Sequence, residues 1–164
     1  MSVRYLSSPI GVLRLWAREG KLRQIELVPA AEQDFPDAVT EQAAAELQEY
    51  FSGKRTEFTV AALPHGTAFQ QKVWSALSRV PYGRVVTYGE LAAAIGQPTA
   101  CRAVANAVGK NPLLILVPCH RVVGASGLGG FFAGLEAKRA LLTLEGVQIS
   151  EKSPFPEKFF FTFS

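Results

Sequence analysis

The 164-residue chain has very few of the side chains that bind metals or form disulfides. It contains two cysteines and two histidines, and no cysteine precedes Cys101. Two cysteines cannot form a disulfide framework, and these four residues show no recognised zinc spacing. We therefore expect no metal site, no cofactor and a reducing compartment, the cytoplasm, in which a thiol persists.

Long apolar runs are also missing. The first six residues lack the apolar core of a signal peptide, and no run approaches the roughly 18 apolar residues that a membrane span requires. We expect no membrane partner. The formal net charge is only +3, a mildly basic value that permits a nucleic-acid partner without requiring one.

Against this scarcity, one of the two cysteines stands beside one of the two histidines. Cys119 and His120 follow the apolar run 113–116, which is typical of a buried strand. A thiol is a poor nucleophile until a base or a positive field raises its thiolate fraction. A free cysteine is more often inert core packing than a nucleophile. The pair alone therefore fits either interpretation: an activated nucleophile with its base, or a buried cysteine beside a surface histidine.

The first part of the chain predicts a small mixed domain. Residues 3–28 read as a β-meander, and residues 57–60 as a short strand that completes its sheet. Residues 40–51 predict a helix, in which Glu46 and Glu49 fall off the apolar stripe and are expected on a solvated face. Nothing in this part carries visible chemistry.

A helix-turn-helix pattern follows a predicted helix over residues 67–79. Thr87 and Glu90 form a capping box, which begins a short helix. Thr99 is expected to cap a second helix that ends at Val108.

The second helix of this pair has two different faces. Ala100, Val104 and Val108 share one buried arc, and Cys101 at its edge is expected to pack. The opposite face is small except for one long cation, so another surface can approach its backbone closely. A tight helical hairpin without a DNA partner is the alternative. The residues of this outer face are Arg102, Ala103, Ala105 and Asn106.

The remaining residues predict a loop, a helix and an aromatic tail. Four glycines in the loop 124–130 permit close approach of a ligand. Residues 135–144 predict a helix with Leu135 and Leu142 facing inward. From residue 150 onward the chain carries five phenylalanines, which are expected to cover an exposed face or to meet a partner.

Several motifs in order resemble one family. Residues 111–122, which include Asn111, Pro118, Cys119, His120 and Arg121, resemble the acceptor-cysteine signature of the O6-alkylguanine-DNA alkyltransferases. Four further stretches resemble the same family, at residues 81–92, 102–104, 134–138 and 141–146. The resemblance is strong from residue 66 to 147 and covers the first sixty residues only in general layout.

This resemblance implies an α+β fold. A small N-terminal sheet-and-helix domain is expected at residues 1–63. A helical domain with a winged-helix-like helix-turn-helix is expected at residues 64–150, and an aromatic-rich tail at 151–164. The implied function is direct, irreversible transfer of an alkyl group from O6-alkylguanine, and from O4-alkylthymine, in double-stranded DNA to Cys119. Each molecule would act once, as a monomer, and cooperative binding to DNA is left open.

The family also implies roles for single residues. Cys119 matches the alkyl acceptor, His120 the base that withdraws its proton, and Glu145 the carboxylate that orients the imidazole. Asn111 matches a structural hinge. Tyr88 matches a tyrosine that assists rotation of the nucleotide and contacts the flipped guanine.

DNA and substrate contacts follow from the same resemblance. Arg102 is expected to fill the space that a flipped base leaves, and the outer face of its helix to contact DNA together with Tyr88 and Thr99. Phe131, Val122 and Gly130 are expected to line the substrate pocket. Where family members often have Gly-Tyr-Ala-Gly-Gly-Leu, this chain has Phe131 in place of the tyrosine, so the aromatic wall is kept and its hydroxyl is lost.

Three other functions are compatible with parts of the pattern. A thiol hydrolase would use Cys119, His120 and Glu145 with repeated turnover. A non-catalytic sensor of alkylated DNA would share the fold, but family relatives of that type lack the acceptor cysteine. A plain helix-turn-helix regulator would leave the Cys–His–Glu set unexplained.

Overall fold

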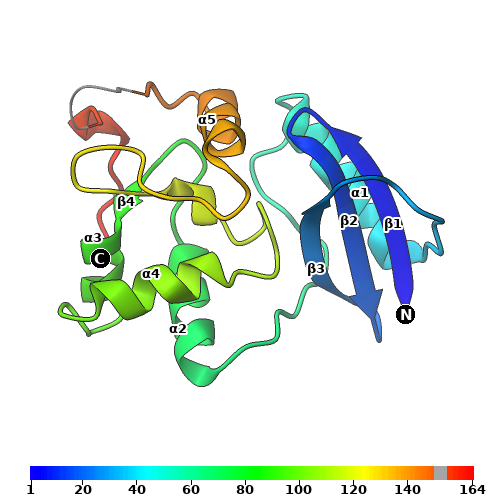
Figure 1. The fold of residues 1–164 in the computed structure, drawn as a ribbon, viewed down its shortest axis with the longest axis horizontal. Helices are drawn as coiled ribbons and strands as arrows, with labels where there is room; N and C mark the ends of the chain where they lie inside the picture. The colour runs from blue at the N-terminus through cyan, green and yellow to red at the C-terminus, as the bar shows by residue number, and fades with distance from the viewer. Residues whose placement is uncertain (150–154) are drawn as a thin grey trace. The chain divides into compact units, whose positions relative to one another are not determined.

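The computed structural model describes residues 1–149 and 155–164. The chain divides into two compact units (Figure 1). The first consists of Met1–His65 with Pro112–Leu116, and the second of Gly66–Asn111 with Val117–Ser164. The first unit combines a sheet with one helix and the second is mainly helical, so the predicted α+β fold class is confirmed. Among the described residues, no helix is both long and apolar enough to cross a membrane.

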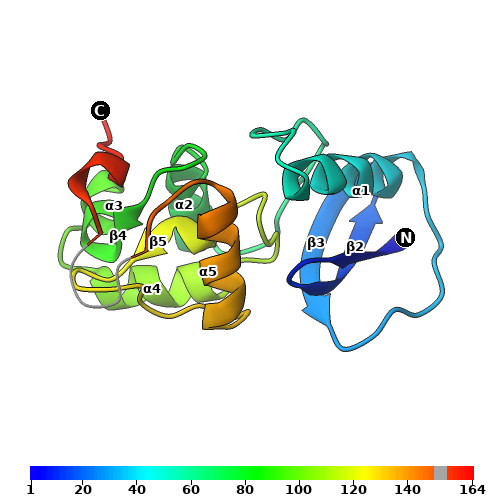
Figure 2. The ribbon, with the colours of Figure 1, turned by 90° about the horizontal axis from the view of Figure 1, so that it is seen from above.

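The first unit is built on an antiparallel sheet in the order β1-β2-β3, as the predicted meander requires. Its strands are β1 (Ser2–Ser8), β2 (Gly11–Arg18) and β3 (Lys21–Val28). Alternate side chains of β2 are fully buried because successive residues of a strand point to opposite faces. Helix α1 (Ala38–Phe51) lies along one face of this sheet (Figure 2).

Helix α1 carries the first correction to the sequence analysis. Glu46, expected in solvent, is only 3% exposed. Its carboxylate accepts hydrogen bonds from Thr59 N (2.8 Å), Thr59 Oγ1 (2.8 Å) and Val60 N (3.2 Å). The predicted strand at residues 57–60 is therefore wrong, since these amides donate to a side chain and not to a neighbouring strand.

The segment Pro112–Leu116 is buried, as predicted, but it is not a strand. Leu113 forms only an isolated parallel bridge with Ile25, supported by hydrogen bonds from Ile25 N to Pro112 O (2.9 Å) and from Leu114 N to Ile25 O (3.2 Å). Ile115 then has a φ of 74°, which ends the extended run. A β-branched residue rarely adopts this left-handed conformation, so the sequence gives no sign of the turn.

The second unit contains α2 (Ala68–Leu77), α3 (Tyr88–Ala94), α4 (Cys101–Gly109) and α5 (Leu135–Leu144). Helix α2 begins at the predicted cap, Thr67, through a capping box with Gln70. The Trp74 indole of α2 is buried and donates a hydrogen bond to the Ala107 carbonyl of α4 (2.9 Å). This contact joins α2 to the second helix of the helix-turn-helix.

The helix-turn-helix is confirmed with changes at its second helix. The Thr87–Glu90 capping box begins α3 as predicted. Thr99 does not cap α4, because it lies in a turn closed by a hydrogen bond from Ala100 N to Gln97 O, and the helix begins after Ala100 without a side-chain cap. Cys101, expected to pack, is exposed.

Two short strands and the C-terminal segment complete the second unit. Strand β4 (Val86–Thr87) pairs in parallel with β5 (Val122–Val123). A 3₁₀ turn, Cys119–Arg121, comes directly before β5, and another, Glu157–Phe159, lies near the C-terminus. The predicted tail at 151–164 falls partly outside the described residues, which resume at Phe155.

Helix α5 has the predicted bounds but a different buried face. Leu135, expected to face inward, is 47% exposed, whereas Leu142 is fully buried as predicted. The buried face also includes Ala137, Lys138 and Leu141. Lys138 is therefore part of the buried face of α5, whereas Leu135, which was expected there, is not.

Candidate active site

Cys119 lies at the first position of a tight 3₁₀ turn and is only 1% exposed. The turn is fixed by hydrogen bonds from Cys119 N to Val117 O (2.8 Å) and from Arg121 N to Pro118 O (2.9 Å). Asn111, which follows α4, donates from Nδ2 to both Val117 O (2.8 Å) and Cys119 Sγ (3.1 Å). Asn111 thus links the end of α4 by hydrogen bonds to the Cys119–Arg121 turn and the residues before it.

The resting thiol is protonated. Burial raises the pKa of Cys119 to about 12, against the opposing effects of the Asn111 hydrogen bond and the positive charge of Lys138. A thiol with this pKa needs a base before it can act as a nucleophile.

His120 is the group placed to act as that base. Its Nε2 lies 2.7 Å from Glu145 Oε2, and a carboxylate at this position makes Nε2 the protonated nitrogen. Nδ1 is buried and has no hydrogen-bond partner among the described residues. Burial lowers the pKa of His120, although Glu145 opposes this. The ring is therefore neutral, with the lone pair on Nδ1 able to accept a proton.

Glu145, at the end of α5, is held as a carboxylate. Arg121 Nε donates to Oε1 (2.8 Å), Arg121 Nη2 to Oε2 (2.9 Å) and Gly83 N to Oε1 (3.1 Å). Burial alone would raise the pKa of Glu145, but His120 and Arg121 outweigh it and the pKa is lowered. Arg121 also donates to the Val80 carbonyl (2.7 Å), so it fixes the loop through hydrogen bonds.

Lys138 is a member of the site that the sequence analysis did not assign. Its fully buried ammonium donates to the carbonyls of Val122 (2.6 Å), Leu128 (2.5 Å) and Gly130 (3.0 Å). Burial lowers its pKa to about 8, while the Cys119 thiolate would raise it. The only signal in the sequence is that Lys138 lies three and four residues before Leu141 and Leu142, on the buried stripe.

Beside these residues is an apolar cavity of about 400 Å³. Tyr88, at the start of α3, forms part of its wall, and its hydroxyl donates to the Gly130 carbonyl (3.5 Å). Burial, and then the Cys119 charge, raise the pKa of Tyr88. The remaining lining residues are Ala105, Val108, Gly109, Gly130, Phe131 and Phe132.

The lining of the cavity overlaps the predicted pocket only in part. Phe131 and Gly130 line it as expected, but Val122 lies in β5 with a fully buried side chain and does not. Phe132 was not assigned to the pocket and does line it.

The glycine-rich loop comes close to other parts of the same chain at Gly129, whereas the predicted approach was that of a ligand. Its φ is 73°, and a Cβ there would lie 3.0 Å from Gly124 N and 3.3 Å from Tyr88 Cε2. Only glycine fits this backbone without displacing its neighbours.

The predicted DNA-binding residues gather on the outer face of α4. An open groove of about 860 Å³ follows this face. Arg102, Ala103 and Asn106 are exposed on it, and Ala105 is half-buried. The groove is lined by Thr99, Ala100, Arg102, Ala103, Ala105 and Asn106. Among the described residues, no group of three or more His, Cys, Asp or Glu side chains is arranged to hold a metal ion.

Two family models account for nearly the whole chain. The 6-O-methylguanine DNA methyltransferase, DNA binding domain, matches residues 68–147, and the ribonuclease-like domain of the same name matches residues 1–64. The chain belongs to the 6-O-methylguanine DNA methyltransferase family. The match to the DNA binding domain includes the Cys119–Arg121 turn, the contact between His120 and Glu145, and the groove along α4.

Individual relatives agree with this assignment. The methylated-DNA–protein-cysteine methyltransferase of Methanosarcina acetivorans is 44% identical over 147 residues, covering 85% of this chain and 94% of the relative. The crystal structure of Mycobacterium tuberculosis O6-methylguanine methyltransferase has a TM-score of 0.78 at 44% identity, covering 87% of this chain and 92% of the other. That of M. tuberculosis OGT in complex with DNA has a TM-score of 0.80 at 46% identity, covering 87% and 91%.

Proposed function

We propose that this methyltransferase-family chain repairs double-stranded DNA by moving the alkyl group of O6-alkylguanine onto Cys119, once per molecule. The observation that carries the proposal is the buried Cys119 next to His120. Glu145 binds Nε2 of His120, and Nδ1 has no hydrogen-bond partner among the described residues, so Nδ1 is available to accept a proton. Family membership and the DNA-bound relative support DNA as the substrate.

The substrate nucleotide has to leave the base stack before a protein thiol can reach it, at a cost of roughly a few kcal/mol. Helix α4 offers a face of small residues for close contact with DNA, with Arg102 as its long cation. Arg102 would occupy the space of the extruded base. The guanine would enter the apolar cavity, where Tyr88 and Phe131 supply aromatic walls.

The chemistry is a displacement at carbon. The Cys119 proton passes to His120 Nδ1, through a water, and Glu145 balances the resulting positive charge. The thiolate forms an S–C bond as the C–O6 bond breaks, and the electron pair stays on guanine. The Tyr88 hydroxyl would protonate the leaving base and would regain its proton from the His120 imidazolium through water, so the net movement is one proton from the thiol to guanine.

Asn111 and Lys138 support the nucleophile in this scheme. Both act to lower the pKa of Cys119, the first by a hydrogen bond to sulfur and the second by its charge. Lys138 also binds the carbonyls that shape the loop beside the cavity. These contacts favour the thiolate at the moment the proton leaves.

The product is a thioether, which water does not readily cleave, so the protein is consumed. O4-alkylthymine is proposed as a second substrate. We also propose that the chain works as a monomer in the reducing cytoplasm, without cofactor or metal. The domains would span residues 1–63 and 64–150, followed by the tail at 151–164.

The test is a titration with duplex DNA that contains one O6-methylguanine. Methyl groups removed should rise with protein and stop at one per active molecule. Cys119→Ala should bind the same DNA in a salt-sensitive gel shift, because phosphate contacts supply the affinity, and should transfer nothing. Repeated turnover would favour a thiol hydrolase, and binding without transfer by the natural chain would favour a sensor of alkylated DNA.

A further inference from the structure

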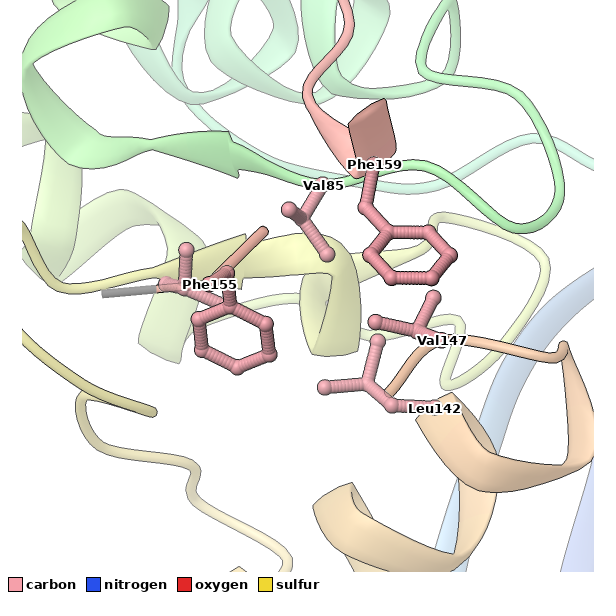
Figure 3. Close-up of a cluster of buried hydrophobic side chains, with 6 residues drawn as sticks. Val85, Leu142, Val147, Phe155 and Phe159 are labelled. Atoms are coloured by element: carbon pink, nitrogen blue, oxygen red, sulfur yellow. The ribbon is translucent and has the colours of Figure 1, made fainter. Parts of the chain in front are cut away.

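Residues 155–161, which lie beyond the matched range 68–147, pack into the second unit. Phe155 and Phe159 are buried, at 4% and 9% exposed. They belong to an apolar cluster in which side chains from four parts of the unit meet (Figure 3). The buried members of this cluster are Val85, Val123, Leu142, Val147, Phe155 and Phe159.

Backbone hydrogen bonds attach the same segment to the chain before β4. Val85 N donates to Phe159 O (2.8 Å), and Phe161 N donates to Val85 O (2.9 Å). Val86 and Thr87 pair with Val122 and Val123 on β5. Alternate residues of an extended chain direct their backbone groups to opposite edges. The C-terminal segment therefore binds residue 85 on one edge of this stretch, and β5 pairs with the next two residues, which form β4, on the other.

These two strands carry the reactive groups. Strand β4 ends at Thr87, which caps α3, and Tyr88 is the first residue of that helix. Strand β5 begins directly after the Cys119–Arg121 turn. The C-terminal segment reaches both: its backbone binds Val85, the residue directly before β4, and its phenylalanines share the buried cluster with Val123 of β5.

We propose that residues 155–161 are a positioning element for alkyl transfer, with Phe159 as its central positioning residue. By holding β4 and β5 together, the segment fixes the place of Tyr88 relative to Cys119. This inference rests on the proposed function of the site. A segment that only completed the core would affect the fraction of folded protein and not the rate constant of the molecules that are folded.

The experiment compares Phe159→Ala with Phe163→Ala. Phe163 lies two residues after this segment and packs against Phe161 and Arg79, outside the buried cluster. Single-turnover transfer from O6-methylguanine duplex is measured, with active protein counted by titration and DNA affinity by gel shift. Phe159→Ala should lower the rate constant per active molecule by about 10-fold, because small misplacements of reacting groups are costly, at unchanged affinity. Phe163→Ala should match the natural chain.

A double-mutant cycle with Tyr88→Phe tests whether the effect passes through Tyr88. The Tyr88→Phe substitution should cost less in the Phe159→Ala background than in the natural chain. Phe159→Leu, which keeps an apolar side chain, should recover most of the rate. If Phe159→Ala does not fold, Phe155→Ala, at the other buried phenylalanine of the cluster, takes its place and should also lower the rate constant.

Two results would overturn the inference: an unchanged rate constant with only a lower melting temperature in Phe159→Ala, or in Phe155→Ala where it takes its place, or fully additive effects with Tyr88→Phe. A natural chain that transfers no alkyl group would instead refute the proposed function itself.

Discussion

Each unit of the molecule contains a buried glutamate, and the two have different partners. Glu46 in the first unit is surrounded by neutral donors from Gln42, Thr59 and Val60. Glu145 in the second unit contacts His120, Arg121 and one backbone amide. Burial opposes ionisation of both, yet the pKa of each is lowered by its hydrogen bonds, and that of Glu145 also by charges.

This difference separates a structural carboxylate from one linked to chemistry. Glu46 replaces the strand partner that Thr59 and Val60 lack, so its role ends with the backbone it holds. Glu145 binds an imidazole whose other nitrogen is unpartnered among the described residues. Under the proposed function, a change in its charge would therefore reach the thiol of Cys119. Burial and a lowered pKa do not distinguish the two, whereas a titratable partner does.

The largest expected effect is on the transfer rate of Glu145→Gln. The amide keeps the shape of the side chain but cannot balance an imidazolium, so the single-turnover rate constant should fall by about 100- to 10,000-fold. Glu46→Gln is the matched control and should leave the rate constant per active molecule unchanged. Equal rates for the two variants would remove the distinction between the carboxylates.

Arg102→Ala should sharpen the comparison inside the second unit. Losing an aid to base extrusion worth on the order of 1–3 kcal/mol would slow transfer from duplex DNA about 5- to 150-fold. Reaction with a free alkylguanine base needs no extrusion and should keep its rate, whereas His120→Ala should slow both substrates. Quench measurements with both substrates decide the matter, and equal slowing by Arg102→Ala would mean that this residue has another role.

Glu46→Ala should act on stability alone. It leaves the amides of Thr59 and of the buried Val60 without their acceptor, at a cost of about 2 kcal/mol in the free energy of unfolding. Urea unfolding of the variant and the natural chain measures this difference. A loss below a few tenths of a kcal/mol would show that the buried hydrogen bonds are readily replaced by water.

The smallest expected effect is in the pH dependence of stability. Both glutamates have folded-state pKa values below the ordinary value of 4.5, so each stabilises the fold above that pH and loses its contribution as the pH falls through the folded value. The free energy of unfolding should therefore decrease below about pH 4.5, as each carboxylate becomes protonated. Denaturant titrations from pH 7 to 3 should show a shallower decrease in Glu145→Gln, and an unchanged slope would contradict the lowered pKa.

Local signals in the sequence predicted much of the fold. The meander, the capping box at Thr87 and the bounds of α5 depend on short-range patterns, and the structure contains each of them. The motifs around Cys119 and Glu145 likewise pointed to one site, and the structure brings the two segments into contact through His120 and Arg121.

The errors concern residues whose environment is made by distant parts of the chain. Glu46 and Lys138 are charged side chains that become buried because acceptors or donors arrive from other segments, and periodicity carries no information on such partners. The predicted strand at 113–116 is wrong for a related reason. Leu113 forms an isolated bridge with Ile25, and the positive φ of Ile115 then ends the extended conformation.

The most direct test of the account uses the two cysteines, one exposed and one buried. The protein is incubated with duplex DNA containing O6-methylguanine, its intact mass is measured, and the modified peptide is sequenced by mass spectrometry. The account predicts a mass increase of a single methyl group, located entirely on the buried Cys119. Methylation of the exposed Cys101, or a natural chain that remains unmodified, would contradict it.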